Sequence, residues 1–210
     1  MIEPRTHRAP RGRFVEGLAS LGSLAGAGLL ILVALAVGSL IPASDENIEH
    51  RQRPYAVQGG VGDTRSTDKL DIRVAGVRGA GKIKDDDRTH DTGGVWIIVK
   101  VRVATRTEAG LIPYAAARDR HGRIYELSSR IEQSLNGRML QPGIPLTGEL
   151  VFEVPKDAAT DLTVLFADNS LDRRMDRQVE IALPTVDKAT VDRWLADAAT
   201  TLIDTEVSTA

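Results

Sequence analysis

The sequence predicts a mostly β protein built around an antiparallel β-sandwich, and three observations support this fold class. Seven short runs between Leu70 and Leu183 alternate apolar and polar residues with a period of two, as half-buried strands do. Turn-forming residues separate the runs, and no apolar pattern of helical period interrupts them. Seven such strands in about 115 residues are typical of an antiparallel sandwich.

The seven predicted strands differ in how apolar they are on each face. In chain order they are 70–74, 95–103, 112–116, 124–125, 150–154, 162–166 and 179–183. The run 95–103 is apolar along one whole face, and Trp96 and Ile98 make the start of its other face apolar. Between the third and fourth runs, Asp119 and Gly122 supply the residue types that open and close a hairpin turn.

A glycine-rich segment, Gly76–Lys82, follows the first of these runs. Its spacing is that of a phosphate-binding loop, but Ile83 stands where Ser or Thr would hold magnesium. Charged residues follow where the helix of such a loop would begin. We therefore expect a glycine-rich turn that leaves the first strand.

An uncharged run of 24 residues, Leu18–Ile41, precedes the strands. A helix of that length is roughly 36 Å long, enough for the ~30 Å hydrocarbon core of a bilayer. Four arginines lie before it, in residues 1–17, which predicts a cytoplasmic N-terminal tail and an extracytoplasmic domain. We expect a single-pass plasma-membrane protein.

Two alternatives for this N-terminal region stay open. Residues 41–43 loosely resemble a signal-peptide cleavage site, although the apolar run is far longer than the roughly 7–15 residues usual there. Gly22 and Gly26 form a GxxxG step, which could pair the helix with a second copy.

The remainder of the chain divides into three expected parts. Residues 42–68 are rich in charge and glycine and predict a flexible tether, and residues 69–184 hold the sandwich. From residue 185 to 206, apolar side chains recur at helical spacing, which predicts an amphipathic helix of about five turns. Trp194, Leu195 and Leu202 on that helix either pack on the sandwich or contact a partner membrane protein.

Composition excludes several classes of function. The chain has no cysteine, so thiol catalysis and thiolate metal sites are impossible. Residues 45–210 carry 23 basic and 27 acidic side chains, a net charge of −4 that argues against nucleic-acid binding. The four histidines lack ligand spacing, and no nucleophile elbow is present. We expect no enzyme activity and no cofactor. The bias towards arginine, alanine and valine is typical of GC-rich, actinobacterial coding sequences.

The densest acidic cluster comprises Asp85, Asp86, Asp87 and Asp91. Oxygen-rich loops bind calcium, but His90 and Trp96 stand where an EF-hand loop needs glycine and glutamate. A solvated loop between strands and a weak metal site are both open interpretations.

An ordered set of motifs between Gly94 and Pro155 resembles the immunoglobulin-like domain family DUF4352, and also the secreted mycobacterial immunoglobulin-like antigens. The motifs are the long run 95–103, the D-x-x-G-x-x-Y hairpin Asp119–Tyr125, and the L-x-P-G and G-x-x-V-F-x-V-P elements in 140–143 and 148–155. Thr105-Arg106-Thr107 departs from the family, which often has asparagine there. The resemblance implies an immunoglobulin-like, extracytoplasmic module with no catalytic residues to carry over.

Two hypotheses for the function follow from this organisation. The first is a non-catalytic interaction module that serves as accessory subunit of a membrane or envelope complex, such as a transporter. Its contacts would come from edge strands or from the terminal helix. The second is an extracytoplasmic sensor that binds a cation, such as calcium, or another ligand in the loop 85–91.

Overall fold

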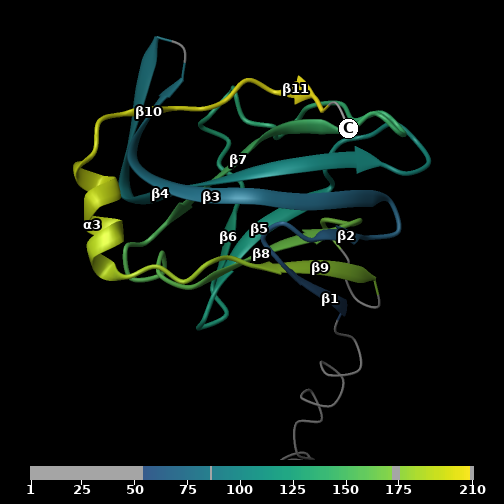
Figure 1. The fold of residues 1–210 in the computed structure, drawn as a ribbon, viewed down its shortest axis with the longest axis horizontal. Helices are drawn as coiled ribbons and strands as arrows, with labels where there is room; N and C mark the ends of the chain where they lie inside the picture. The colour runs from purple at the N-terminus through teal and green to yellow at the C-terminus, as the bar shows by residue number, and fades with distance from the viewer. Residues whose placement is uncertain (1–53, 86, 172–175, 209–210) are drawn as a thin grey trace, which may run out of the picture. The chain divides into compact units, whose positions relative to one another are not determined.

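The computed structural model describes residues 54–85, 87–171 and 176–208. They form a β-sandwich of two sheets, seen one above the other in Figure 1. The first sheet has the order β1-β9-β8-β5-β6, and the second has the order β10-β3-β4-β7-β11, with β2 also paired to β3. The predicted fold class, mostly β and a sandwich, is confirmed.

The strands range from 2 to 18 residues. Those of the first sheet are β1 (Tyr55–Gly60), β5 (Tyr114–Asp119), β6 (Ile124–Glu126), β8 (Leu162–Ala167) and β9 (Arg177–Ala182). Those of the second are β2 (Thr64–Ser66), β3 (Leu70–Asp85), β4 (Arg88–Thr105), β7 (Leu146–Val154), β10 (Thr200–Thr201) and β11 (Glu206–Val207). Neighbouring strands are antiparallel except for two pairs, β1 with β9 and β10 with β3.

The main core lies between the two sheets, and all seven predicted strands contribute to it or to its edges. The inward face of β4, from Val95 to Val103, is at most 1% exposed. It packs against the first sheet, where Phe166 and Ile181 are fully buried. The faces of these strands predicted from the alternation are therefore correct. The alternation identifies them because a register slip by one residue would turn every apolar side chain outward.

A second, smaller apolar cluster lies on the outer face of the second sheet. Trp96 and Ile98 of β4 are fully buried there, together with Val151 of β7 and Leu202 from the C-terminal segment. The apolar start of the outer face of β4 is thus explained, because the chain beyond β9 and the loop before β7 cover it.

The segment 42–68, expected to be a flexible tether, belongs to the sandwich from Tyr55 onward. β1 runs parallel to β9 over six residue pairs, and β2 pairs with the start of β3. Neither strand has a sustained apolar alternation, because β1 lies at an edge of its sheet and half of its residues are exposed. This expectation was wrong for residues 55–66.

The glycine-rich segment 76–82 is not a turn but the middle of β3, which bulges at two places. Gly79 lies directly under the Trp194 ring, and a Cβ added at Gly79 would overlap that ring. A glycine is required here because the helix side chain approaches the strand backbone closely.

We expect Gly79→Ala to lower the stability of the domain by about 1–3 kcal/mol, the usual cost of overpacking. The measurement is thermal unfolding of the full chain in detergent. Gly76→Ala is the control, because a Cβ at Gly76 meets no atom within 4 Å. Equal effects of the two substitutions would contradict this packing explanation.

The C-terminal region also differs from the predicted helix over 185–206. The helix α3 spans only Lys188–Ala196; it begins after Asp187, whose carboxylate accepts a hydrogen bond from the Thr190 N–H at 2.8 Å. The chain turns extended at Asp197 and crosses the outer face of the second sheet to β11. Leu202 fitted the helical spacing by coincidence, since it belongs to this extended segment and is buried against the outer face of the second sheet.

This C-terminal segment, residues 200–208, pairs with both edges of the second sheet. β10 pairs with β3 at Ile83 and Lys84, and β11 pairs with β7 at Leu146 and Thr147. Between them, Glu149 accepts a hydrogen bond from the Ile203 N–H at 3.0 Å. The edges through which strand addition was expected are therefore paired, along these stretches, within the domain itself.

The predicted anchor (18–41), the cytoplasmic tail (1–17) and the Gly22/Gly26 step lie outside the described residues. Among the residues that the structure does describe, there is no helix of the length and apolar character that crossing a bilayer requires.

Candidate functional site

The hairpin formed by β3 and β4 extends beyond the body of the sandwich and is the first candidate site. β7 pairs with β4 only as far as Val95, whereas Lys82–Asp85 pairs with Arg88–Asp91 beyond that point. In Figure 1 this hairpin projects at the end of the second sheet where β10 pairs with β3, on the side where α3 lies. We call residues 82–91 the arm.

Hydrogen bonds from the loop before β7 hold the outer end of the arm, where Asp85 pairs with Arg88. The carboxylate of Asp85, only 6% exposed as a residue, accepts from the Glu132 N–H at 2.7 Å and the Gln133 N–H at 3.3 Å. The Trp96 indole donates to the His90 carbonyl at 3.2 Å. Both strands of the arm are therefore tied to the domain, which preorganises the tip.

A hollow of about 220 Å³ opens at the arm and is lined by charged and titratable side chains. They are Asp85, Asp87, Arg88, His90 and Glu132. His90 Nε2 lies 3.9 Å from the Asp85 carboxylate, so these two groups form an ion pair when the imidazole is protonated. Such a mixture of acids and bases suits polar recognition of a partner surface.

The predicted metal residues lie around this arm, and the three that the structure describes, Asp85, Asp87 and Asp91, do not form a group that could hold a metal ion. Asp85 uses both carboxylate oxygens for backbone N–H groups, and Asp91 lies 3.6 Å from the ammonium of Lys82. Asp87 lines the hollow, and Asp86 lies outside the described residues. Within the described ranges, no group of three or more His, Asp or Glu side chains gathers to hold a metal ion. Cation binding at the arm stays a prediction.

The Asp119–Tyr125 hairpin is built around one buried carboxylate. Asp119 accepts hydrogen bonds from the His121 and Arg123 N–H groups at 2.8 and 2.9 Å, and from Arg123 Nε at 2.6 Å. The Tyr125 hydroxyl donates to it at 3.1 Å. Gly122 closes the turn with a φ of 80°, which few other residues adopt. The D-x-x-G-x-x-Y motif therefore has a structural role.

The hydrogen bonds set the charge state of this carboxylate. Burial alone would raise the pKa of Asp119, but the side chain and N–H of Arg123, the His121 N–H and the Tyr125 hydroxyl together lower it to about 2. Burial, and then the hydrogen bond to Asp119, raise the pKa of Tyr125. Asp119 is thus ionised and fully paired at neutral pH, a state that stabilises the hairpin and leaves no base for catalysis.

The predicted partner-contact residues all face the domain. Trp194 and Leu195 are half-buried against the main core, and Leu202 is 5% exposed in the second cluster. Of the two interpretations left open by the sequence, packing on the sandwich is the one that the structure shows.

A second candidate surface, which sequence reasoning missed, is the end of the sandwich where β1 begins. We call it the entry end; it contains the turn 67–69, the loops 106–113, 137–145 and 168–171, and β11. The pairing register brings these segments together, because Tyr55 pairs with Arg177 beside the end of β8, and Val207 pairs with Leu146 at the start of β7. The bridge between Gly110 and Leu140 joins two of the loops.

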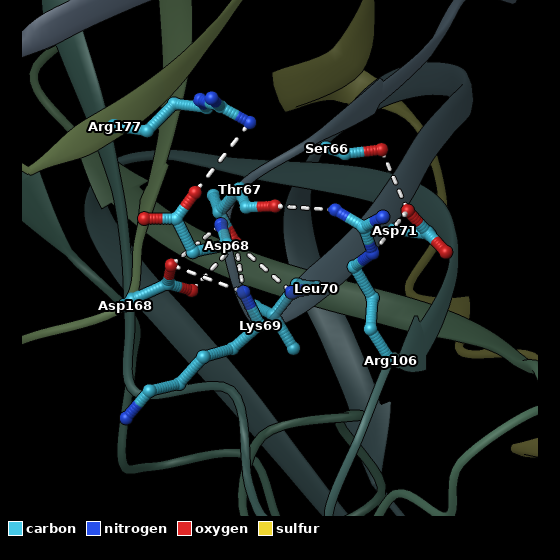
Figure 2. A network of polar contacts seen from close by, with 9 residues as sticks. All are labelled: Ser66, Thr67, Asp68, Lys69, Leu70, Asp71, Arg106, Asp168 and Arg177. Carbon is cyan, nitrogen blue, oxygen red and sulfur yellow. Dashed lines mark hydrogen bonds and ion pairs between the residues drawn. The ribbon is translucent and has the colours of Figure 1, made fainter.

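Figure 2 shows the polar network that holds the entry end together. The Asp168 carboxylate, which follows β8, accepts from the Thr67 hydroxyl at 2.5 Å and from the N–H groups of Asp68 and Lys69 at 2.8 and 3.1 Å. Thr67 is itself fully buried and accepts from the Leu70 N–H at 2.9 Å. A single carboxylate therefore connects the first sheet to the turn between β2 and β3 of the second sheet.

Exposed apolar side chains gather at the entry end. Six of the seven large exposed apolar residues of the described chain lie there: Tyr55, Leu111, Met139, Ile144, Leu171 and Val207. Five of the six belong to loops or to the two-residue strand β11, and Tyr55 is the first residue of β1; a periodic pattern does not predict which side chains face outward in such positions.

Comparison with known proteins gives similarities of structure only. No family model and no curated protein matches the chain. An uncharacterized β-sandwich protein from Clostridium difficile 630 is similar with a TM-score of 0.41 and 12% identity, over 62% of this chain and 95% of that one. The YjhA protein from Bacillus subtilis gives 0.45 and 18%, over 59% and 98%. The secreted protein MPT63 from Mycobacterium tuberculosis gives 0.46 and 16%, over 61% and 98%. All three TM-scores lie below 0.5, so the fold assignment rests on the two sheets described above.

Proposed function

We propose that this protein is a non-catalytic interaction module with an immunoglobulin-like sandwich, anchored by residues 18–41 on the outer face of the plasma membrane. It serves as an accessory subunit of a membrane or envelope complex, such as a transporter. The observation that carries this proposal is the arm, a preorganised and charged hairpin at the opposite end of the sandwich from the start of β1.

The arm has the properties of a protein-recognition element. Its exposed side chains carry both signs of charge: the bases are Lys82, Lys84 and Arg88, and the acids are Asp87 and Asp91. Complementary charges steer association and select partners. Because Asp85 and Trp96 tie both strands of the arm to the domain, little backbone entropy is lost when the arm binds.

The resemblance to DUF4352 belongs to the same proposal. Its hairpin motif is the turn around Asp119, and its L-x-P-G element is a turn in which the Ile144 N–H donates to the Gln141 carbonyl at 3.2 Å. These motif residues have structural roles, as expected for a module whose family shares a fold and not a reaction.

The test is mild cross-linking in membranes, followed by purification of the full chain and mass spectrometry. We expect one stoichiometric membrane partner, which the double variant Asp87→Lys with Arg88→Glu no longer captures. The matched control, Glu126→Lys with Lys156→Glu, also reverses one exposed acid and one exposed base, outside the arm. An empty purification with intact protein in the membrane, or equal capture by both variants, would contradict the proposal.

Measuring the melting temperature at increasing calcium concentrations distinguishes the cation sensor from the interaction module. An interaction module gives the same melting temperature at every calcium concentration. A rise that disappears in the variant Asp86→Ala with Asp87→Ala would instead support a sensor at the arm.

A further inference from the structure

We infer that the entry end is a membrane seat: its apolar side chains rest in the headgroup region of the bilayer that residues 18–41 are proposed to span. This inference rests on the anchor in the proposed function, and it adds a second binding surface whose occupant is lipid. Six of the seven large exposed apolar side chains of the described residues lie at this one end. Single exposed apolar residues are ordinary, but a set gathered from several segments marks an interaction surface.

The residue types at the entry end suit a lipid surface. Tyr55 is 68% exposed, and tyrosine is enriched at the level of the headgroups. Met139 and Leu171 are 57% and 95% exposed, and such aliphatic side chains enter the boundary between headgroups and acyl chains.

The length of the connecting chain brings this end to the membrane. Because β1 takes up the sequence from Tyr55, only the 13 residues 42–54 separate it from the apolar run, instead of the 27 of the expected tether. Thirteen residues span at most about 45 Å when fully extended. The start of β1, and with it the entry end, therefore stays within this distance of the bilayer, and the short linker gives the bilayer a high effective concentration at this surface.

The carboxylates of the polar network at the entry end are paired within the domain, so they add little repulsion from an anionic lipid surface; Glu108 and Glu206 of the same end are exposed. Asp168 is occupied by the hydrogen bonds described above, Asp68 lies 3.5 Å from Arg177, and Asp71 lies 3.8 Å from Arg106 (Figure 2). Each carboxylate of this network is therefore neutralised by a guanidinium group or by N–H and O–H donors. Seating this end on the bilayer directs the arm away from the membrane.

The absence of cysteine in the chain makes a direct test simple. Met139→Cys and Leu111→Cys are labelled with an environment-sensitive fluorophore in the full chain, reconstituted in vesicles of phosphatidylcholine with a minority of phosphatidylglycerol. Ile124→Cys is the matched control, because Ile124 is 45% exposed, against 46% for Leu111, and lies at the other end of the sandwich.

We expect a blue-shifted emission at positions 139 and 111, with severalfold stronger quenching by headgroup-nitroxide lipid than at position 124. Equal quenching at all three positions overturns the membrane seat. A blue shift without lipid quenching overturns it as well and identifies protein as the occupant; if that shift also grows with protein density, the occupant is a second copy. Flotation of the vesicles separates the two proposals: a chain that does not float lacks the proposed anchor, whereas a floating chain without quenching lacks only the seat.

Discussion

We expect the Glu149→Ala variant to unfold at a temperature about 10 °C lower than the unsubstituted chain. Glu149 is 1% exposed, yet its carboxylate accepts hydrogen bonds from both terminal nitrogens of Arg78 and from the Ile203 N–H. Removing the carboxylate deletes its hydrogen bonds to Arg78 and leaves the Ile203 N–H without this acceptor; because the Arg78 side chain is 36% exposed and can be hydrated, the cost is about 3 kcal/mol. Each kcal/mol lowers the melting temperature of a domain of this size by about 2–4 °C.

The control for this prediction lies on the same strand. Glu153 also pairs with an arginine, Arg130 at 3.2 Å, but its side chain is 37% exposed, and we expect Glu153→Ala to cost less than about 1 kcal/mol. Thermal unfolding gives the melting temperatures, and hydrogen exchange at the Ile203 amide reports whether the C-terminal segment has detached. Equal melting temperatures, or an Ile203 amide that stays protected in Glu149→Ala, would show that this carboxylate does not hold the segment.

The second large effect is expected at the Asp119 hairpin. Asp119→Asn keeps the size of the side chain but turns an NH2 group towards donors, so at least one of the four hydrogen bonds is lost. We expect a loss of about 2–4 kcal/mol in the free energy of unfolding, measured by denaturant titration. Asp161→Asn, an exposed position, is the control and should change the free energy by less than about 0.5 kcal/mol.

The same variant changes the acid dependence of stability. The pKa of Asp119 is about 2 in the folded domain, against 3.8 for an ordinary aspartate, so the unfolded chain binds more protons between these values. The stability that Asp119 contributes is therefore fully present above about pH 4 and is lost as the pH falls towards 2. Asp119→Asn should lose less stability over this window than the unsubstituted chain; identical acid titrations would refute the assignment.

The sandwich was predictable because its main strands carry their own signal. The run from Val95 to Val103 keeps one face apolar over nine residues, and burial of that face between two sheets favours one register. The turn at Asp119 was predictable for the same reason, since aspartate and glycine at that spacing have local hydrogen-bonding preferences.

What could not be predicted depends on contacts between distant parts of the chain. The polar strand β1 exists because β9 offers it an edge, and Gly79 and Gly81 of β3 lie in a strand against which α3 packs closely. Leu202 fits a helical pattern, yet it is drawn into a cluster with Trp96. The entry end could not be predicted from the sequence for a related reason, because only the folded topology brings Tyr55, Met139 and Val207 to one end.

The C-terminal segment has a consequence for the order of events during synthesis. Residues 200–207 leave the ribosome after every other strand, and until then the edges of β3 and β7 that they cover remain open. An open edge is a template for pairing with another chain, so an incompletely synthesised domain is prone to aggregation. Nascent chains that stop before Thr200 would therefore need a chaperone, whereas those extending past Val207 would fold and release it.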